Sequence, residues 1–120
     1  MSFDWRNPER VVPWKPKQRF RVTPSGQEAV ERYRATVRAA QEAEDPRAEL
    51  ERAKKTWAAG LGLRPIDGIL LEDLAGGRTS LAELRDTLDA IDLSLREARG
   101  SLDRLVKARL IEPLEPSVAP

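Results

Sequence analysis

The feature that most constrains this chain is a pair of closely spaced helix-start signals. Ser80 is followed three residues later by Glu83, and Ser94 is followed in the same way by Glu97. Each pair is an S-x-x-E capping box, in which the two side chains satisfy free backbone N–H groups at a helix N-terminus. Two helix starts this close leave room for a short helix, a tight turn and a second helix. This is the outline of a helix-turn-helix.

The spacing of apolar residues around these signals predicts where the helices run. Leucines at intervals of three and four predict a short helix over 81–89 and a longer one over 95–109. A similar stripe that begins at Pro65 and ends before Gly76 predicts a helix ahead of them. The stretch 110–114, "LIEPL", predicts a short strand that its proline ends.

Two further helices are predicted in the first half of the chain. A third S-x-x-E box, Ser25 to Glu28, opens a helix over 26–44 whose apolar stripe is narrow and rich in alanine. Asp45 then caps a helix over 46–60 that has proline at its first position. Because a narrow alanine-rich face suits close helix packing, we expect these two helices to form an αα-hairpin or a dimer interface.

Prolines and charge divide the chain into parts. Pro8, Pro13 and Pro16 exclude a helix and a central strand at the N-terminus, so we expect an extended segment there. The predicted fold is mainly α, with a helix-turn-helix domain, two preceding helices and a short two-stranded β element. The predicted parts are an extended basic arm rich in proline and tryptophan (1–18), a strand with two helices (19–60), a helix-turn-helix core (61–114) and a disordered tail (115–120).

Composition excludes several kinds of site. The chain has no cysteine and no histidine. This rules out disulfides, thiolate or imidazole metal sites and Ser-His-Asp or Cys-His catalysis. The carboxylates lie at helix-surface spacings beside basic residues, which is typical of solvated faces and not of acid–base pairs. We therefore expect neither an enzyme nor a metal or other cofactor.

The chain also lacks the signals of membrane insertion and secretion. No stretch approaches the roughly 20 apolar residues of a membrane span. The opening "MSFDWRNPER" has no apolar region of the kind found in signal peptides. We expect a soluble cytoplasmic protein without membrane contact.

The stretch 69–114, "ILLEDLAGGRTSLAELRDTLDAIDLSLREARGSLDRLVKARLIEPL", resembles the helix-turn-helix of winged-helix regulators of the MarR and PadR type. Those families have a leucine-rich first helix, a short second helix and a third that ends in a "GLI"-like strand entry. Here the entry is "RLI", with Arg109 where the family has a glycine. The resemblance implies that Arg109 takes the left-handed conformation at a cost of about 1 kcal/mol, or that the helix ends differently.

A second resemblance lies in an unusual place. The stretch 19–33, "RFRVTPSGQEAVERY", is similar to the strand and helix that follow the wing in that family, yet here it precedes the helix-turn-helix. We therefore hypothesise that strand 19–23 pairs with strand 110–114, within one chain or across a swapped dimer. The alternative is coincidence, because strand, turn and capping box form a common local combination.

The resemblance implies double-stranded DNA as a partner, with helix 95–109 in the major groove. Arg96 and Arg99 suit guanine or phosphate, and Gly100 leaves the middle of the face bare. Arg78 and Ser80 would lie near phosphates at the start of the second helix. The outward positions expected on the longer helix are Arg96, Glu97, Arg99, Gly100, Asp103, Arg104 and Lys107.

Charge is distributed unevenly along the chain. Residues 1–24 carry six basic and two acidic side chains, whereas residues 61–90 carry three basic and six acidic ones. DNA affinity depends on neutralising phosphates, so the N-terminal arm must supply much of the attraction. The arm residues expected to contact the DNA backbone are Lys15, Lys17, Arg19 and Arg21.

Two functions remain open from the sequence. The first is a small transcriptional regulator or nucleoid-associated factor that binds DNA, expected as a homodimer through helices 26–60. The alternative is a winged-helix module for protein partners, in which the arm docks on another protein and Trp5 or Trp14 acts as a hot spot. A tail that merely packs one tryptophan is the simpler interpretation of the arm.

Overall fold

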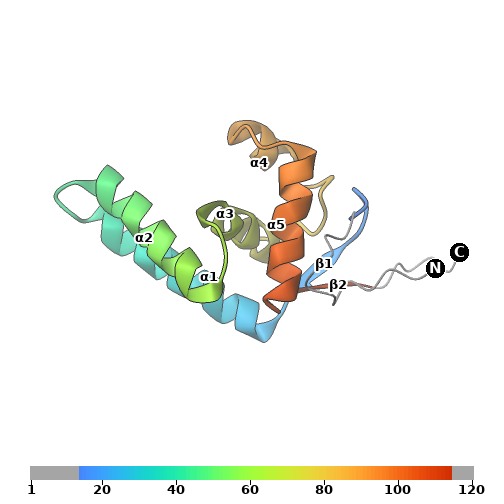
Figure 1. Ribbon diagram of the computed structural model, residues 1–120, viewed down its shortest axis with the longest axis horizontal. Coiled ribbons are helices and arrows are strands. Elements are labelled where there is room, and N and C mark those ends of the chain that lie inside the picture. Colours follow the sequence, from blue (N-terminus) through green and yellow to red (C-terminus); the bar gives the residue numbers. More distant parts are fainter. Residues whose placement is uncertain (1–13, 115–120) are drawn as a thin grey trace, which may run out of the picture.

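The computed structural model describes residues 14–114 of the chain. The described residues form five helices and two short strands, so the mainly α class with a two-stranded element is confirmed (Figure 1). Predictions for residues 1–13 and for the tail 115–120 lie outside the described residues. The elements are β1 (Phe20–Val22), α1 (Pro24–Gln41), α2 (Pro46–Leu61), α3 (Pro65–Ala75), α4 (Arg85–Ala90), α5 (Leu95–Lys107) and β2 (Ile111–Pro113).

The two strands pair within the chain, as the strand-pairing hypothesis requires. β1 and β2 are antiparallel, and Arg21 lies opposite Glu112. On its other side β1 donates one further backbone hydrogen bond, from the Phe20 N–H to the Thr79 carbonyl oxygen at 2.8 Å. β1 therefore lies between β2 and the loop that joins α3 to α4.

The start of α1 differs from the prediction. The helix begins at Pro24, and Thr23, not Ser25, is its N-cap. The Thr23 hydroxyl accepts the Gly26 N–H at 3.0 Å and donates to the Arg109 carbonyl oxygen at 2.7 Å. Proline at the first helical position needs no N–H partner, so a helix start with Thr23 as N-cap and Pro24 as first residue is favoured over a start capped by Ser25. This cap also ties the start of α1 to the end of α5.

The predictions from the capping boxes at Ser80 and Ser94 have different outcomes. Ser94 caps α5 as predicted and accepts the Glu97 N–H at 3.2 Å. Ser80 accepts the Glu83 N–H at 3.3 Å, but the residues that follow form a turn, and α4 begins only at Arg85. The predicted helix start at residue 81 is therefore wrong by one turn.

The end of α5 adopts the left-handed conformation that the resemblance implied. Arg109 has a φ of +63°. Its N–H donates to the Val106 carbonyl oxygen at 2.9 Å, and the Leu110 N–H donates to that of Leu105 at 3.1 Å. This bond pair is a Schellman motif, which satisfies the last carbonyls of the helix. It turns the chain directly into β2.

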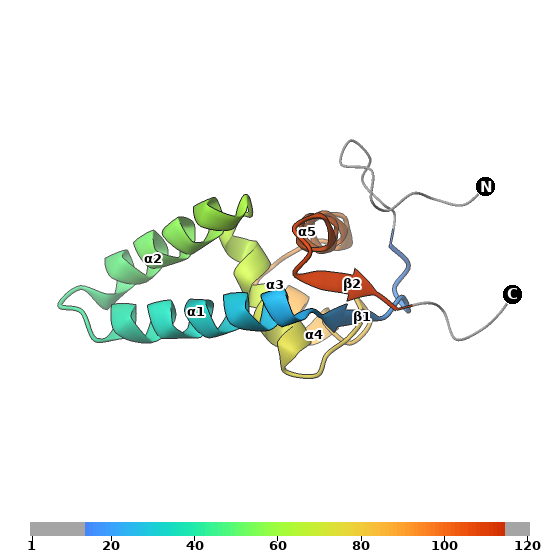
Figure 2. The ribbon, with the colours of Figure 1, turned by 90° about the horizontal axis from the view of Figure 1, so that it is seen from below.

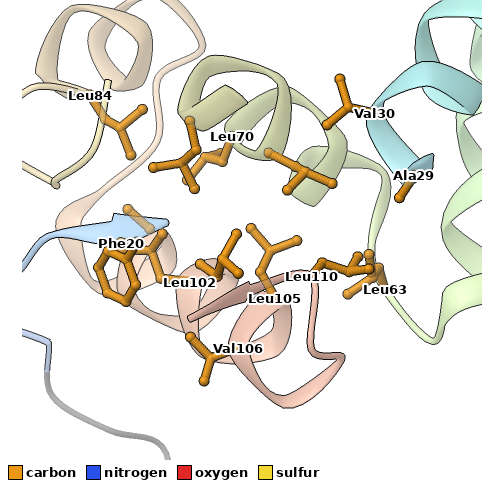
Figure 3. Close-up of a cluster of buried hydrophobic side chains, with 14 of the residues drawn as sticks. Phe20, Ala29, Val30, Leu63, Leu70, Leu84, Leu102, Leu105, Val106 and Leu110 are labelled. Carbon is orange, nitrogen blue, oxygen red and sulfur yellow. The ribbon is translucent and has the colours of Figure 1, made fainter. Parts of the chain in front are cut away.

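The hydrophobic core lies where α3 crosses α5 beneath β1 (Figure 3). Leu70, Leu102 and Leu105 are fully buried, and Phe20 extends from β1 into the same cluster. Leu84 closes the core from the turn before α4. Burial of these side chains fixes the orientation of α5 against the rest of the domain.

The α1–α2 hairpin projects away from this core, so the domain is elongated, with extents of 54 × 26 × 23 Å (Figures 1 and 2). At its base the ring of Tyr33 meets Trp57 edge to face, with 5.0 Å between centroids. Gly68 of α3 lies against them, and a Cβ there would stand 2.4 Å from the Tyr33 ring. The hairpin therefore docks on α3 through close contact that only glycine allows.

Candidate nucleic-acid interface

Exposure on α5 is concentrated in its first turn. Leu95, Arg96 and Glu97 are exposed, whereas Arg99 and Gly100 are half-buried. Helix-turn-helix proteins contact base edges with the N-terminal residues of the second helix, so this turn is the part of α5 that suits contact with a groove. A Cβ at Gly100 would meet only a terminal Arg104 nitrogen at 3.4 Å, so packing does not demand glycine there.

The chain just before β1 is hydrogen-bonded to α5 and to the turn that precedes α4. Arg99 donates from Nε to the Trp14 carbonyl oxygen at 2.9 Å, and the Ala82 N–H donates to the Pro16 carbonyl oxygen at 3.0 Å. Trp14 is buried and lies edge to face against Phe20, with 5.1 Å between centroids. This part of the arm therefore lies beside α5 and the turn that precedes α4.

Lysines flank the point of attachment. Lys15 and Lys17 are exposed on either side of Pro16. Neither forms an ion pair with any residue between 14 and 114, and the same is true of Arg96. These three exposed cations come from two distant parts of the chain and could contact an anionic partner without breaking an ion pair within the described residues.

A mainly apolar groove of about 490 Å³ is lined by Pro16 and Leu95, which are sequence neighbours of these cations. It runs between α4, the first residue of α5 and the arm. The sequence did not indicate Arg85 as a member. Helical spacing predicts Leu95 on the inward side of helix 95–109, and this is wrong, because Leu95 is 51% exposed at the start of α5. The lining residues are Pro16, Leu81, Ala82, Arg85, Leu88, Asp89, Leu93 and Leu95.

Acidic side chains lie close to the same face. Asp89 lines the groove and Glu97 is exposed in the first turn of α5. They offset part of the attraction that Lys15, Lys17 and Arg96 exert on phosphate. The face therefore carries charges of both signs.

Arg104 does not lie on this face, and its predicted outward position is wrong. It forms a two-pronged ion pair with Asp67 of α3, with Nε–Oδ2 and Nη2–Oδ1 distances of 2.8 and 2.9 Å. Asp67 is fully buried and also accepts from the Ser101 hydroxyl (2.5 Å) and the Arg64 N–H (2.9 Å). A buried carboxylate at the first turn of α3 needs a cation, and Arg104 supplies it.

Asp103 and Lys107 are also not exposed as predicted. Asp103 is buried, and Lys107 Nζ lies 2.7 Å from its Oδ2, with side chains 5% and 18% exposed. An i,i+4 pair of this kind neutralises both charges. These two residues belong to the packing of α5 and lie outside the open first turn.

The second-helix residues expected near phosphates have protein partners. Ser80 is buried, and its hydroxyl caps the following turn. Arg78 donates to Thr87 at 2.9 Å and pairs with Asp73 at 3.2 Å, with its side chain 46% exposed. Ser80 is therefore not available for contact with phosphate. The charge of Arg78 is partly neutralised by Asp73, although its side chain is still exposed.

The arginines on either side of Phe20 are paired but exposed. Arg21 forms an ion pair with Glu112 across the sheet, and Arg19 lies 3.8 Å from Glu83 and donates to Thr79 at 3.3 Å. Both side chains are about two-thirds exposed. Surface pairs of this kind are weak, so phosphate can compete for either arginine.

The prediction of a tryptophan hot spot is wrong for Trp14. Its ring is buried against Phe20, and its Nε1 has no hydrogen-bond acceptor within the described part of the chain. Packing of one tryptophan by the arm, the simpler interpretation, is confirmed. Trp5 lies outside the described residues.

Residues 14–114 contain no cluster of three or more carboxylates that could hold a metal ion. No helix in the same range is long and apolar enough to cross a lipid bilayer. The described site is an apolar groove with Arg85 and Asp89 in its lining. Comparison with protein-family models, with curated proteins and with solved structures finds no match to this chain.

Proposed function

We propose that this protein binds double-stranded DNA as a small transcriptional regulator or nucleoid-associated factor. The first turn of α5 enters the major groove, and the arm contacts the adjoining backbone. The observation that carries the proposal is the attachment of the arm to the helix-turn-helix through the Arg99–Trp14 and Ala82–Pro16 hydrogen bonds. This attachment holds the backbone on either side of Lys15 against α5 and the turn before α4, and in the proposed complex Lys15 and Lys17 act together with Arg96.

The arrangement of elements supports a permuted winged helix. In a winged helix the strand that follows the second helix-turn-helix helix pairs with the last wing strand. Here β2 follows α5 and pairs with β1, which comes from the beginning of the chain. The bond from Phe20 to Thr79 adds the loop between α3 and α4 to the other side of β1. The arm thus takes the place that a wing would have beside the recognition helix.

Each cation has a distinct proposed role. Arg96, exposed and without an ion pair, donates to guanine O6 and N7 in the major groove, a contact that discriminates by about 1–3 kcal/mol. Lys15 and Lys17 neutralise phosphates and set the salt dependence of binding. Arg99 fixes the arm and adds a phosphate contact through its remaining N–H groups.

The proposed protein is a homodimer through the α1–α2 hairpin. This hairpin extends beyond the core, and a groove of about 610 Å³ lies between its helices. Alanines and Gly60 line much of this groove, and Arg32, Glu49 and Arg52 supply charges of both signs along it. A twofold pair would bury the groove against its own copy. Light scattering tests this, and a strict monomer at high micromolar concentration would contradict it.

DNA binding is tested by fluorescence anisotropy with a labelled random duplex at several salt concentrations. With three to four phosphates neutralised by each protomer, we expect the logarithm of the affinity to fall with the logarithm of salt at a slope of about −3 for each bound protomer. The Lys15→Ala/Lys17→Ala variant is expected to make this slope shallower by about 2 for each bound protomer. Lys54→Ala/Lys55→Ala on α2 removes the same charge from the projecting hairpin and serves as the matched control.

Two results would contradict the proposal. One is the absence of any anisotropy change at about 50 mM salt and micromolar protein. The other is an equal change of slope in the two double variants, which would mean that overall charge and not this face governs binding.

The second candidate function is a protein-interaction module. The observation that favours it is the apolar groove beside α4, together with exposed Leu95 at its edge. Burial of Trp14 removes one of the two anchors that the sequence offered for this role, and the other, Trp5, lies outside the described residues. Failure of DNA binding at low salt would favour this candidate.

A further inference from the structure

The first residue of α5 has an unusual environment. Leu95 is 51% exposed, the highest exposure of any large apolar side chain in the described chain. It stands between the Ser94 cap and Arg96, at the tip of the helix that enters the major groove in the proposed function. An exposed leucine at the end of a helix adds nothing to the core, since burial is what stabilises an apolar side chain.

Leu95 is also continuous with other apolar surface. It lines the groove together with Leu93 from the preceding turn and Pro16 from the arm. Arg85 lines the same groove, and Lys15, Lys17 and Arg96 adjoin its lining residues in sequence. A face that meets DNA through these cations therefore presents apolar atoms between them.

The chemistry of the major groove limits what such atoms can contact. Base edges there display hydrogen-bond donors and acceptors, and the apolar group among them is the C5 methyl of thymine. We infer that Leu95 contacts a thymine methyl group beside the guanine contacted by Arg96. This inference rests on the proposed function and makes the preferred site one in which thymine and guanine are adjacent.

A competing apolar contact is the sugar of the DNA backbone. Deoxyribose is the same at every nucleotide, so contact with it would strengthen binding without preference for thymine. The two contacts can be separated, because uracil differs from thymine only by the missing C5 methyl group. Replacing thymine with uracil leaves sugars, phosphates and Watson–Crick edges unchanged.

The experiment compares two duplexes of about 20 base pairs, long enough for a dimeric helix-turn-helix site. Both consist of repeating guanine–thymine steps, and in one every thymine is replaced with uracil. Anisotropy at low salt measures the affinity of the full-length protein for each. We expect about fourfold weaker binding to the uracil duplex for each methyl group that Leu95 covers.

Leu95→Ala is the test variant, and it should bind the thymine and uracil duplexes equally. Leu114→Ala removes the other exposed leucine, 37% exposed at the end of β2, and should keep the preference. Both side chains are exposed, so both variants should unfold at the wild-type temperature, which a thermal melt verifies.

The outcomes separate this inference from the proposed function. Equal binding of both duplexes by the wild-type protein, with steep salt dependence, overturns the thymine contact and leaves DNA binding intact. A thymine preference that survives in Leu95→Ala assigns the methyl contact to another residue and also overturns it. Binding to neither duplex overturns both proposals.

Discussion

Gly26 in the first turn of α1 lies directly against the backbone of Leu110, so that a Cβ on the glycine would stand 1.9 Å from the leucine carbonyl oxygen. The same oxygen accepts the Thr23 N–H at 3.0 Å. The beginning of α1 and the end of α5 are therefore joined at the distance of backbone contact. A side chain at this position has no space, because the atom opposite it is backbone.

Gly26→Ala is expected to destabilise the protein by about 3 kcal/mol, because overpacking against fixed backbone forces α1 away from β2. Chemical denaturation measures the free energy of unfolding. Gly60→Ala on α2 is the control, since a Cβ there meets nothing within 4 Å. That variant should gain about 0.5–1 kcal/mol from higher helix propensity. Similar effects of both substitutions would show that the Leu110 contact is not close.

Arg104→Ala is expected to cost about 3–5 kcal/mol, because it leaves the charge of Asp67 buried without its cation. Arg34→Ala is the comparison, since Arg34 pairs with Glu72 at 3.3 Å on the surface. That loss should stay below about 1 kcal/mol. If the two variants unfold at the same denaturant concentration, the Asp67 pair is not buried as described.

Tyr33 gives the protein a stability change at high pH. Burial, and secondarily the Glu72 carboxylate, raises the pKa of Tyr33 from 10.0 to about 12. The neutral phenol is favoured in the folded state, so its contribution is complete below pH 10 and is lost as pH rises toward 12. The loss amounts to about 3 kcal/mol.

The titration can be followed directly, because Tyr33 is the single tyrosine of the chain. Tyrosinate absorbance should appear near pH 12 in the folded protein and near pH 10 in denaturant. Tyr33→Phe should remove the corresponding part of the stability loss between these two values. A tyrosinate midpoint near pH 10 in the native protein would disprove the shift.

Arg109→Gly is expected to stabilise the protein by about 1 kcal/mol, because glycine adopts a positive φ without the steric cost of a side chain. Arg109 has a φ of +63° at the end of α5. Arg109→Ala tests the cause, since alanine retains the Cβ and should gain nothing. Equal stabilisation by both would attribute the gain to loss of the arginine charge.

Local signals predicted most of the fold, because they act between residues close in the chain. The Asp45–Pro46 start of α2 and the Ser94 cap of α5 lie where the sequence placed them. The left-handed end of α5 at Arg109 was one of the two outcomes that the family resemblance implied. The predicted start of α1 was wrong because the sequence offers two possible N-caps close together, Thr23 and Ser25. The hydrogen bond from the Thr23 hydroxyl to the Arg109 carbonyl oxygen favours Thr23.

The candidate site was harder to predict, because its composition depends on contacts between distant residues. Helical spacing places Arg104 and Arg96 on similar outward positions, yet only Arg104 has a buried carboxylate opposite it. Asp67 is 37 residues away, so no local pattern shows this pair. Leu95 and Arg85 became site residues only through the docking of Pro16 beside them.

The pairing of β1 with β2 also bears on how the protein is made. β1 leaves the ribosome before β2, and all five described helices lie between the two strands in the sequence. β1 therefore cannot form its strand pair until these helices have been synthesised. Contacts between residues so far apart in sequence form late, since a long loop must close before they are gained. During synthesis, the edge of β1 that pairs with β2 therefore stays unpaired until residues 111–113 have emerged. A chain truncated shortly before residue 111 would keep its helices and still lack the strand that joins its two ends.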